Sequence, residues 1–141
     1  MRALNILVVD DEPVAAKVMK SYLAGYGTCD SAASGPEAIR HVEDYLRAKN
    51  AMYDLICLDI NMPGMNGHEV LKKIHELEEE HEIQPSDKAR VIMTTLMDDA
   101  SNVTKAFMNQ CEIYLVKPIR KKELLKQLVN LGLIDADDVK G

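Results

Sequence analysis

Five short strand-like segments alternate with five longer amphipathic segments, and this alternation constrains the fold more than any other feature of the sequence. The strand-like segments span 5–9, 28–32, 55–59, 90–95 and 112–116. The amphipathic segments, whose apolar residues recur at helical spacing, span about 13–23, 35–46, 66–81, 101–110 and 120–131. Parallel neighbouring strands need crossover connections, which helices provide. The pattern therefore predicts an α/β fold with a doubly wound, five-stranded parallel sheet and five helices.

The composition of these segments indicates which strands lie inside the sheet. The first, third and fourth are almost continuously apolar, which is typical of central strands, whereas TCDSA at 28–32 is polar enough for an edge. No linker divides the 141 residues, so we expect a single domain over 1–141, with its core at about 4–131 and a short tail at 132–141. The acidic run HELEEEHE at 75–82 is interpreted as a solvated helix end.

Charge and hydropathy argue against two classes of partner. The chain has 17 Lys and Arg against 23 Asp and Glu, and the net charge of −6 argues against direct binding of nucleic acid. No segment has the length and apolarity of a signal peptide or a membrane span. We therefore expect a cytoplasmic protein without membrane insertion.

Polar residues follow or end several of the predicted strands. In doubly wound sheets ligands bind beyond the carboxyl ends of the strands, where Asp10, Asp11, Asp59, Thr95 and Lys117 would meet. Three carboxylates repel one another unless a cation neutralises them, and hard oxygen ligands suit Mg²⁺. A lysine and a threonine hydroxyl beside that ion are donors suited to a phosphoryl group. The sequence therefore predicts a magnesium-dependent phosphoryl site at this edge.

Four motifs carry a family resemblance. They are VVDDE at 8–12, LDINMPGMNG at 58–67, VIMTTLMDD at 91–99 and YLVKP at 114–118. In this order and spacing they resemble the receiver domain of two-component response regulators, of the stand-alone, chemotaxis-regulator-like kind. The resemblance covers nearly the whole chain. It implies a flavodoxin-like sheet with strand order 2-1-3-4-5 and a cis Lys117–Pro118 bond.

The resemblance also implies a role for each residue of the site. Asp59 is the expected phosphoacceptor, and Thr95 is the expected switch hydroxyl, with Thr94 as its rival. The other implied roles are magnesium binding by Asp10, Asp11, Asp59 and the backbone carbonyl of Asn61, binding of the phosphoryl group by Lys117, and a rotating aromatic side chain at Tyr114.

The leading hypothesis is a phosphorylatable switch that catalyses only its own phosphorylation and dephosphorylation. The resemblance implies a sensor histidine kinase or a histidine phosphotransfer protein as the donor, and a downstream protein bound on the face of the fourth helix, fifth strand and fifth helix. A magnesium-dependent phosphohydrolase stays open, although it expects an acid two residues after the nucleophile, where this chain has Asn61. A pseudo-receiver that serves as a structural interaction module, and the N-terminal receiver fragment of a longer regulator, also stay open.

The sequence departs from the family pattern directly after Thr95. Ala or Gly is commonest there, and this chain has Leu96. We expect Leu96 to narrow the path of water or a small phosphodonor to the phosphoacceptor, and Met97 to offer no group that orients water. Asn61 acts in the opposite direction, because its amide can position water. A simpler interpretation is that Leu96 only packs under the fourth helix.

Overall fold

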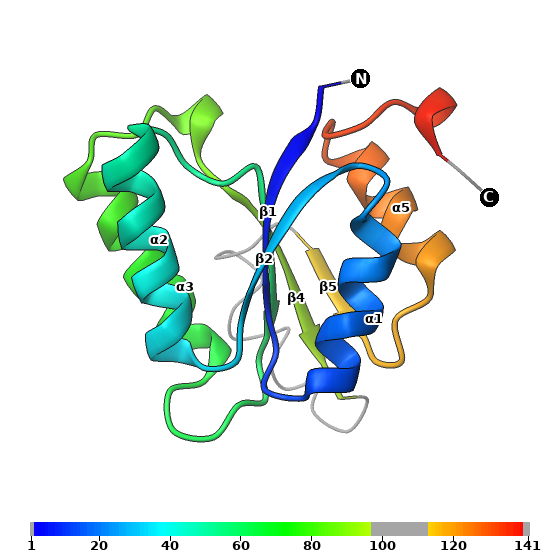
Figure 1. Cartoon of the computed structure of the whole chain (residues 1–141), viewed down its shortest axis with the longest axis horizontal. Helices are drawn as coiled ribbons and strands as arrows, with labels where there is room; N and C mark the ends of the chain where they lie inside the picture. Colours follow the sequence, from blue (N-terminus) through cyan, green and yellow to red (C-terminus); the bar gives the residue numbers. More distant parts are fainter. Residues whose placement is uncertain (1, 97–112, 140–141) are drawn as a thin grey trace.

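The computed structural model describes residues 2–96 and 113–139, which form a parallel sheet between two layers of helices (Figure 1). The sheet has the strand order β2-β1-β3-β4-β5, and every neighbouring pair is parallel. The predicted strand order is confirmed, and the polar β2 lies at one edge. The strands are β1 (Leu4–Val9), β2 (Gly27–Ala32), β3 (Leu55–Asp59), β4 (Arg90–Thr95) and β5 (Ile113–Val116).

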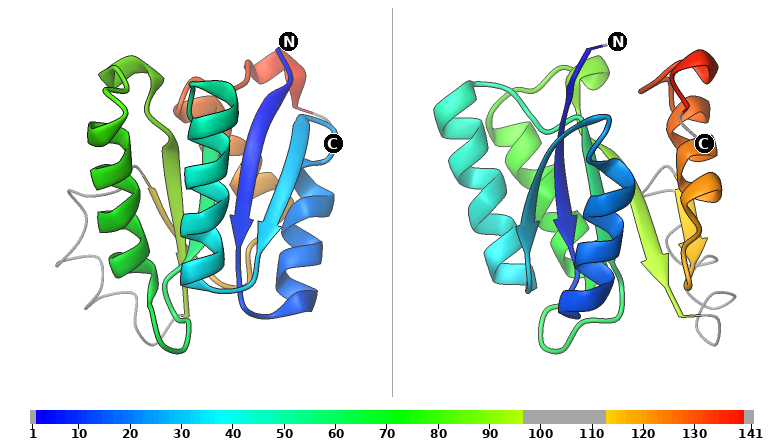
Figure 2. Two further views of the ribbon diagram at one scale, coloured as in Figure 1. Left: turned by 60° about the vertical axis from the view of Figure 1, so that its left-hand side comes forward. Right: turned by 45° about the vertical axis from the view of Figure 1, so that its right-hand side comes forward.

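The helices divide between the two faces of the sheet (Figure 1, Figure 2). One face carries α2 (Gly35–Lys49) and α3 (Gly67–Glu80), and the other carries α1 (Pro13–Leu23) and α5 (Lys121–Asn130). This arrangement confirms the doubly wound fold. The helix predicted at 101–110 lies outside the described residues. Two short 3-10 helices are η1 (Pro85–Asp87) and η3 (Ala136–Asp138).

Local sequence signals explain where the helices begin. Pro13 opens α1 in the first turn, where its missing N–H needs no partner. The Ser34 hydroxyl accepts a hydrogen bond from the Glu37 backbone N–H at 3.2 Å and caps α2. At α3, Asn66 and Glu69 form a reciprocal capping box. That capping box fixes the end of the loop that follows β3.

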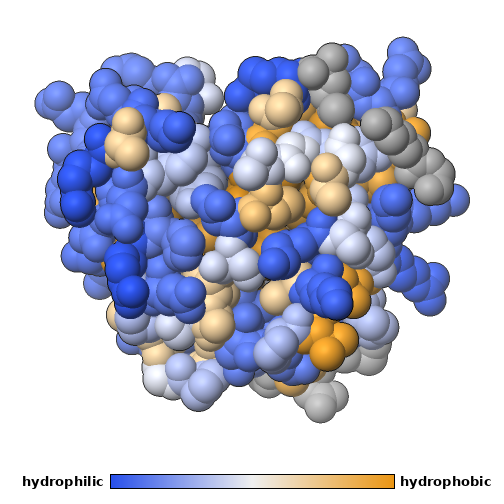
Figure 3. All heavy atoms as spheres, viewed as in Figure 1, coloured by the Kyte–Doolittle hydropathy of each residue, from blue (hydrophilic) through white to orange (hydrophobic). Residues whose placement is uncertain are grey.

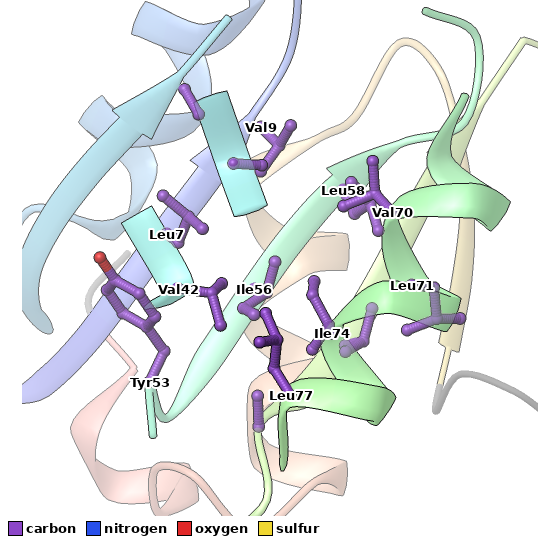
Figure 4. Close-up of a cluster of buried hydrophobic side chains, with 14 of the residues drawn as sticks. Leu7, Val9, Val42, Tyr53, Ile56, Leu58, Val70, Leu71, Ile74 and Leu77 are labelled. Carbon is purple, nitrogen blue, oxygen red and sulfur yellow. The ribbon is translucent and has the colours of Figure 1, made fainter. Parts of the chain in front are cut away.

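Strand β3 is buried on both faces, which explains its continuous apolarity. Ile56 and Leu58 pack in the cluster beneath α2 and α3, as Figure 4 shows. Leu55 and Cys57 pack in a second cluster, on the face of α1 and α5. Because side chains alternate along a strand, Asp59 follows Cys57 onto the α1 and α5 side. The Asp59 carboxylate therefore lies at the C-terminal edge of the sheet, on the side of α1 and α5.

Two buried residues correct expectations from the sequence, one about solvent exposure and one about the extent of the core. Glu78 lies in the run interpreted as a solvated helix end, yet it is only 1% exposed. Its side-chain oxygens accept the Ala89 backbone N–H at 2.9 Å and lie 3.1 Å from His75 Nδ1, so the buried carboxyl group has polar partners. Ile134 is buried in the second cluster, so the core extends past residue 131.

On the face seen in Figure 3, the surface over α2 is mostly hydrophilic, whereas hydrophobic residues are more frequent on the α1 side. Val14 and Val18, both on α1, are exposed. Among the helices of residues 2–96 and 113–139, none has the length and apolarity that a membrane span requires.

Candidate functional site

The carboxyl edge of the sheet brings three aspartates together, as the sequence predicts. Asp10 and Asp11 follow β1, and Asp59 ends β3. One carboxylate oxygen from each lies within 4.8 Å of the other two. Asp59 and Asp10 are only 2% and 8% exposed, and Asp11 is partly buried. Oxygens this close suit a hard divalent cation, because uncompensated carboxylates repel one another.

A backbone N–H two residues further along the chain holds each of the two buried aspartates. The Glu12 N–H donates to Asp10 Oδ1 at 2.9 Å, and the Asn61 N–H donates to Asp59 Oδ1 at 3.0 Å. Such Asx turns fix the carboxylate relative to its loop. Sequence reasoning missed these turns, although an aspartate that precedes a loop is their usual signal.

Lys117 supplies a positive charge to the site. Its Nζ lies 3.0 Å from Asp10 Oδ2 and 3.3 Å from Asp59 Oδ2, and its side chain is largely buried. The residue directly follows β5, and the Lys117–Pro118 bond is cis, as the resemblance implies. One ammonium is therefore shared between carboxylates from two strands.

Burial dominates the electrostatics of Asp59. It raises the pKa of the Asp59 carboxyl to about 6; the charge of Asp10 acts in the same direction, while Lys117 and the Asn61 N–H oppose it. For Lys117, burial favours the neutral amine, but the hydrogen bond to Asp10 and the charge of Asp59 outweigh burial and raise the lysine pKa. With its pKa raised, Lys117 stays an ammonium, and this positive charge favours the carboxylate form of Asp59, whose oxygens are nucleophilic.

Asn61 joins the loop after β3 to the end of β4. The buried Thr95 hydroxyl donates to Asn61 Oδ1 at 3.3 Å, and the same oxygen accepts the Leu96 N–H at 3.2 Å. The sequence suggested two roles for Asn61, magnesium binding by its backbone carbonyl and positioning of water by its side-chain amide. It did not indicate this bridge. No local pattern signals it, because the partners lie far apart in the sequence.

A cavity of about 460 Å³ lies beside the site, between α1, the end of β4 and the loop after β5. Asp10 and Lys117 line this cavity together with Thr94 and Leu96. Leu96 is 49% exposed. The cavity therefore offers a route from solvent to the charged groups.

Two predicted residues remain. Tyr114 on β5 is partly buried and packs against the cluster beneath α2 and α3. Met97 lies outside the described residues.

Comparison with known proteins agrees with this geometry. The family model described as the response regulator receiver domain matches residues 6–129. The chain belongs to the response regulator receiver family. Receiver domains are generally non-enzymatic signalling modules of two-component systems. They bind Mg²⁺ at an acidic pocket and interact with histidine kinases or phosphotransfer proteins and with downstream targets.

Curated relatives of this receiver domain include chemotaxis and regulatory proteins. The chemotaxis protein CheY of Treponema pallidum is 30% identical over 129 residues, which are 90% of this chain and 81% of the relative. The regulatory protein VanRB of Enterococcus faecalis is 30% identical over 127 residues, which are 89% of this chain and 51% of the relative. The receiver domain thus spans about half the length of some relatives that it matches.

Solved structures share the fold. A chain of the CheX-CheY-BeF3-Mg complex from Borrelia burgdorferi superposes with a TM-score of 0.75 at 25% identity, over 92% of this chain and 89% of that one. The receiver domain of the histidine kinase CKI1 from Arabidopsis thaliana, solved as a mutant, gives a TM-score of 0.78 at 22% identity, over 94% and 91%. At 22% identity, the similarity to the CKI1 receiver domain shows the fold alone.

Proposed function

We propose that this receiver domain accepts a phosphoryl group on Asp59 from a phosphohistidine of a sensor histidine kinase or histidine phosphotransfer protein in the cytoplasm. The observation that supports it best is the convergence of Asp10, Asp11 and Asp59 within 4.8 Å, with Lys117 Nζ 3.3 Å from the Asp59 carboxylate. Residues 1–141 act as one receiver unit in this proposal.

The transfer exchanges one bond to phosphorus for another. An Asp59 carboxylate oxygen forms an O–P bond, the N–P bond of the phosphohistidine breaks, and its electron pair returns to the imidazole, which takes up a proton from solvent. The Asn61 N–H at 3.0 Å orients the Asp59 carboxylate, and Lys117 donates to the phosphoryl oxygens. Since the carboxamide of Asn61 cannot protonate a leaving group, the domain catalyses only its own phosphorylation and dephosphorylation.

The carboxylates at this edge fit a magnesium ion by their chemistry. Asp10, Asp11, Asp59 and the backbone carbonyl of Asn61 would hold it, all through hard oxygen atoms. When bound, the ion supplies positive charge that offsets the charge of the transferring oxygens. The site is poor in positive charge without it, since only Lys117 contacts Asp10 and Asp59 among the described basic side chains.

The signal would leave the site through Thr95 and Tyr114. The Thr95 hydroxyl turns to donate to the new phosphoryl group, and Tyr114 moves into the space that Thr95 leaves. A downstream protein then recognises the face of β5 and α5, to which the helix predicted at 101–110, outside the described residues, would contribute. Tyr114 lies on β5, and β5 is the strand at that edge of the sheet, which supports this route.

Phosphorylation by a small acyl phosphate tests the proposal. With magnesium, the wild type should gain the mass of one phosphoryl group, and Asp59→Asn should gain none. Chelation of magnesium should abolish labelling of the wild type. Asp44→Asn, at a surface position on α2, is the matched control and should be labelled like the wild type. Equal labelling of wild type and Asp59→Asn would overturn the assignment.

A further inference from the structure

Asn61 contacts both the phosphoacceptor and the switch hydroxyl, and we infer that its side chain is a latch that holds Thr95 in the unphosphorylated state. The inference rests on the proposed function, because it concerns regulation of the same site. The Asn61 N–H donates to Asp59 Oδ1 at 3.0 Å, while its Oδ1 accepts the Thr95 hydroxyl at 3.3 Å. One residue therefore connects the group that is modified to the group that responds.

The Thr95 hydroxyl has a single proton to donate. In the unphosphorylated molecule Asn61 Oδ1 accepts it, and the Leu96 carbonyl oxygen, at 3.4 Å, is a second acceptor. Water does not compete, because Thr95 is fully buried. To donate to a phosphoryl oxygen on Asp59, the hydroxyl must leave Asn61. Asn61 Oδ1 and the phosphoryl oxygen thus compete for one hydroxyl proton.

The geometry makes the latch weak enough to release. A separation of 3.3 Å is long for a hydroxyl donor, whose hydrogen bonds are usually about 2.7–2.8 Å. A hydrogen bond to a charged phosphoryl oxygen is shorter and about twice as strong as one between neutral groups. The Thr95 hydroxyl therefore prefers the phosphoryl oxygen as its acceptor. Loss of the hydrogen bond to Asn61 lowers the net free energy gained by this change.

The same oxygen extends the latch into the backbone that follows β4. Asn61 Oδ1 also accepts the Leu96 N–H at 3.2 Å, so it holds the first residue after the strand. When Thr95 turns to the phosphoryl group, this oxygen keeps the Leu96 donor and loses the hydroxyl. Asn61 is thus a positioning residue that acts through Thr95 and Leu96.

Titration with beryllium trifluoride and magnesium, a mimic of the phosphoryl group, tests the latch. Asn61→Ala keeps the backbone N–H and carbonyl but removes the acceptor. The mimic should bind this variant about three-fold more tightly than the wild type, the change expected when one weak neutral hydrogen bond is lost. Without the mimic, the Thr95 methyl NMR signal of the variant should move toward its position in the mimic-bound wild type. Asn130→Ala, the same change at an exposed position on α5, is the matched control.

A double-mutant cycle with Thr95→Val isolates the interaction. Without the hydroxyl, Asn61→Ala should leave the affinity for the mimic unchanged. An equal gain in both backgrounds, or no gain in the wild-type background, would overturn the latch. Asn61→Ser, whose side chain is too short to reach Thr95, repeats the test if the alanine variant does not fold. Failure of the mimic to bind the wild type would overturn the proposed function, and the latch with it.

Discussion

Leu96 is the residue whose effect on solvent access to the site can be tested most directly. Its side chain is half exposed and lines the cavity that it shares with Asp10 and Lys117. We propose that this branched side chain narrows the path along which water would approach phosphorus on Asp59. An access barrier of about 1–2 kcal/mol corresponds to about tenfold in rate, so the effect is measurable without being large.

Leu96→Ala is therefore expected to speed loss of the phosphoryl group from Asp59 several-fold. The measurement is the dephosphorylation rate of the purified phosphorylated domain in the presence of magnesium. Val139→Ala, which removes an exposed apolar side chain near the end of the described residues, is the matched control. A rate for Leu96→Ala equal to or slower than that of the wild type would show that Leu96 does not restrict access.

At the scale of helices and strands, the elements that local sequence patterns predict are found close to their expected positions. Strand β3 was expected at 55–59 and spans Leu55–Asp59. Helix α2 continues past its expected end at 46 to Lys49 and stops at Asn50, which adopts a left-handed conformation with φ 50° that asparagine tolerates. Apolar periodicity does not report such an end, because the last turn carries only polar and small residues after Leu46.

Contacts between distant segments could not be predicted from local patterns. The site aspartates were found because the topology of a parallel sheet places every strand end on one edge. The bridge from Asn61 to Thr95 and the burial of Glu78 depend instead on how loops and helices pack. A glutamate in an acidic run is usually solvated, and the nearby Ala89 N–H and His75 Nδ1 explain why this one can be buried.

Glu78 links α3 to the start of β4, and its removal should destabilise the domain. In Glu78→Ala the buried Ala89 N–H loses its acceptor, so the free energy of unfolding should fall by roughly 1–3 kcal/mol. Urea denaturation measures the change. Glu79→Ala, at the next position of the same helix but exposed, should stay within about 0.5 kcal/mol of the wild type. Equal losses in the two variants would contradict a structural role for Glu78.

At the scale of the whole molecule, folding and magnesium binding should be linked. Asp10 follows β1 and Asp59 ends β3, two strands that are far apart in the sequence, so their carboxylates converge only when the sheet has formed. A ligand that binds the native state alone stabilises it by mass action, by about 2.7 kcal/mol at one hundred times its Kd. For a chain of this size that corresponds to a rise in Tm of roughly 8 °C.

Thermal unfolding with and without magnesium chloride checks this link. The rise in Tm should be reversed by a chelator and should be much smaller in Asp10→Asn, which loses one charged ligand. Sodium chloride at the same ionic strength is the control, since screening of the net charge of −6 also stabilises the fold. An equal rise with sodium chloride would mean that the aspartates do not form a specific site.

The sharing of Lys117 between Asp10 and Asp59 has a further consequence, through thermodynamic reciprocity. Three carboxylates against one ammonium leave two negative charges uncompensated, and a divalent cation balances them. A phosphoryl group on Asp59 adds negative charge, so the cation and the phosphoryl group favour each other. If Asp59 is phosphorylated as proposed, phosphorylation should raise the affinity for magnesium by the factor by which magnesium favours the phosphorylated state. The domain would then report two quantities at once, the supply of phosphodonor and the free magnesium around it.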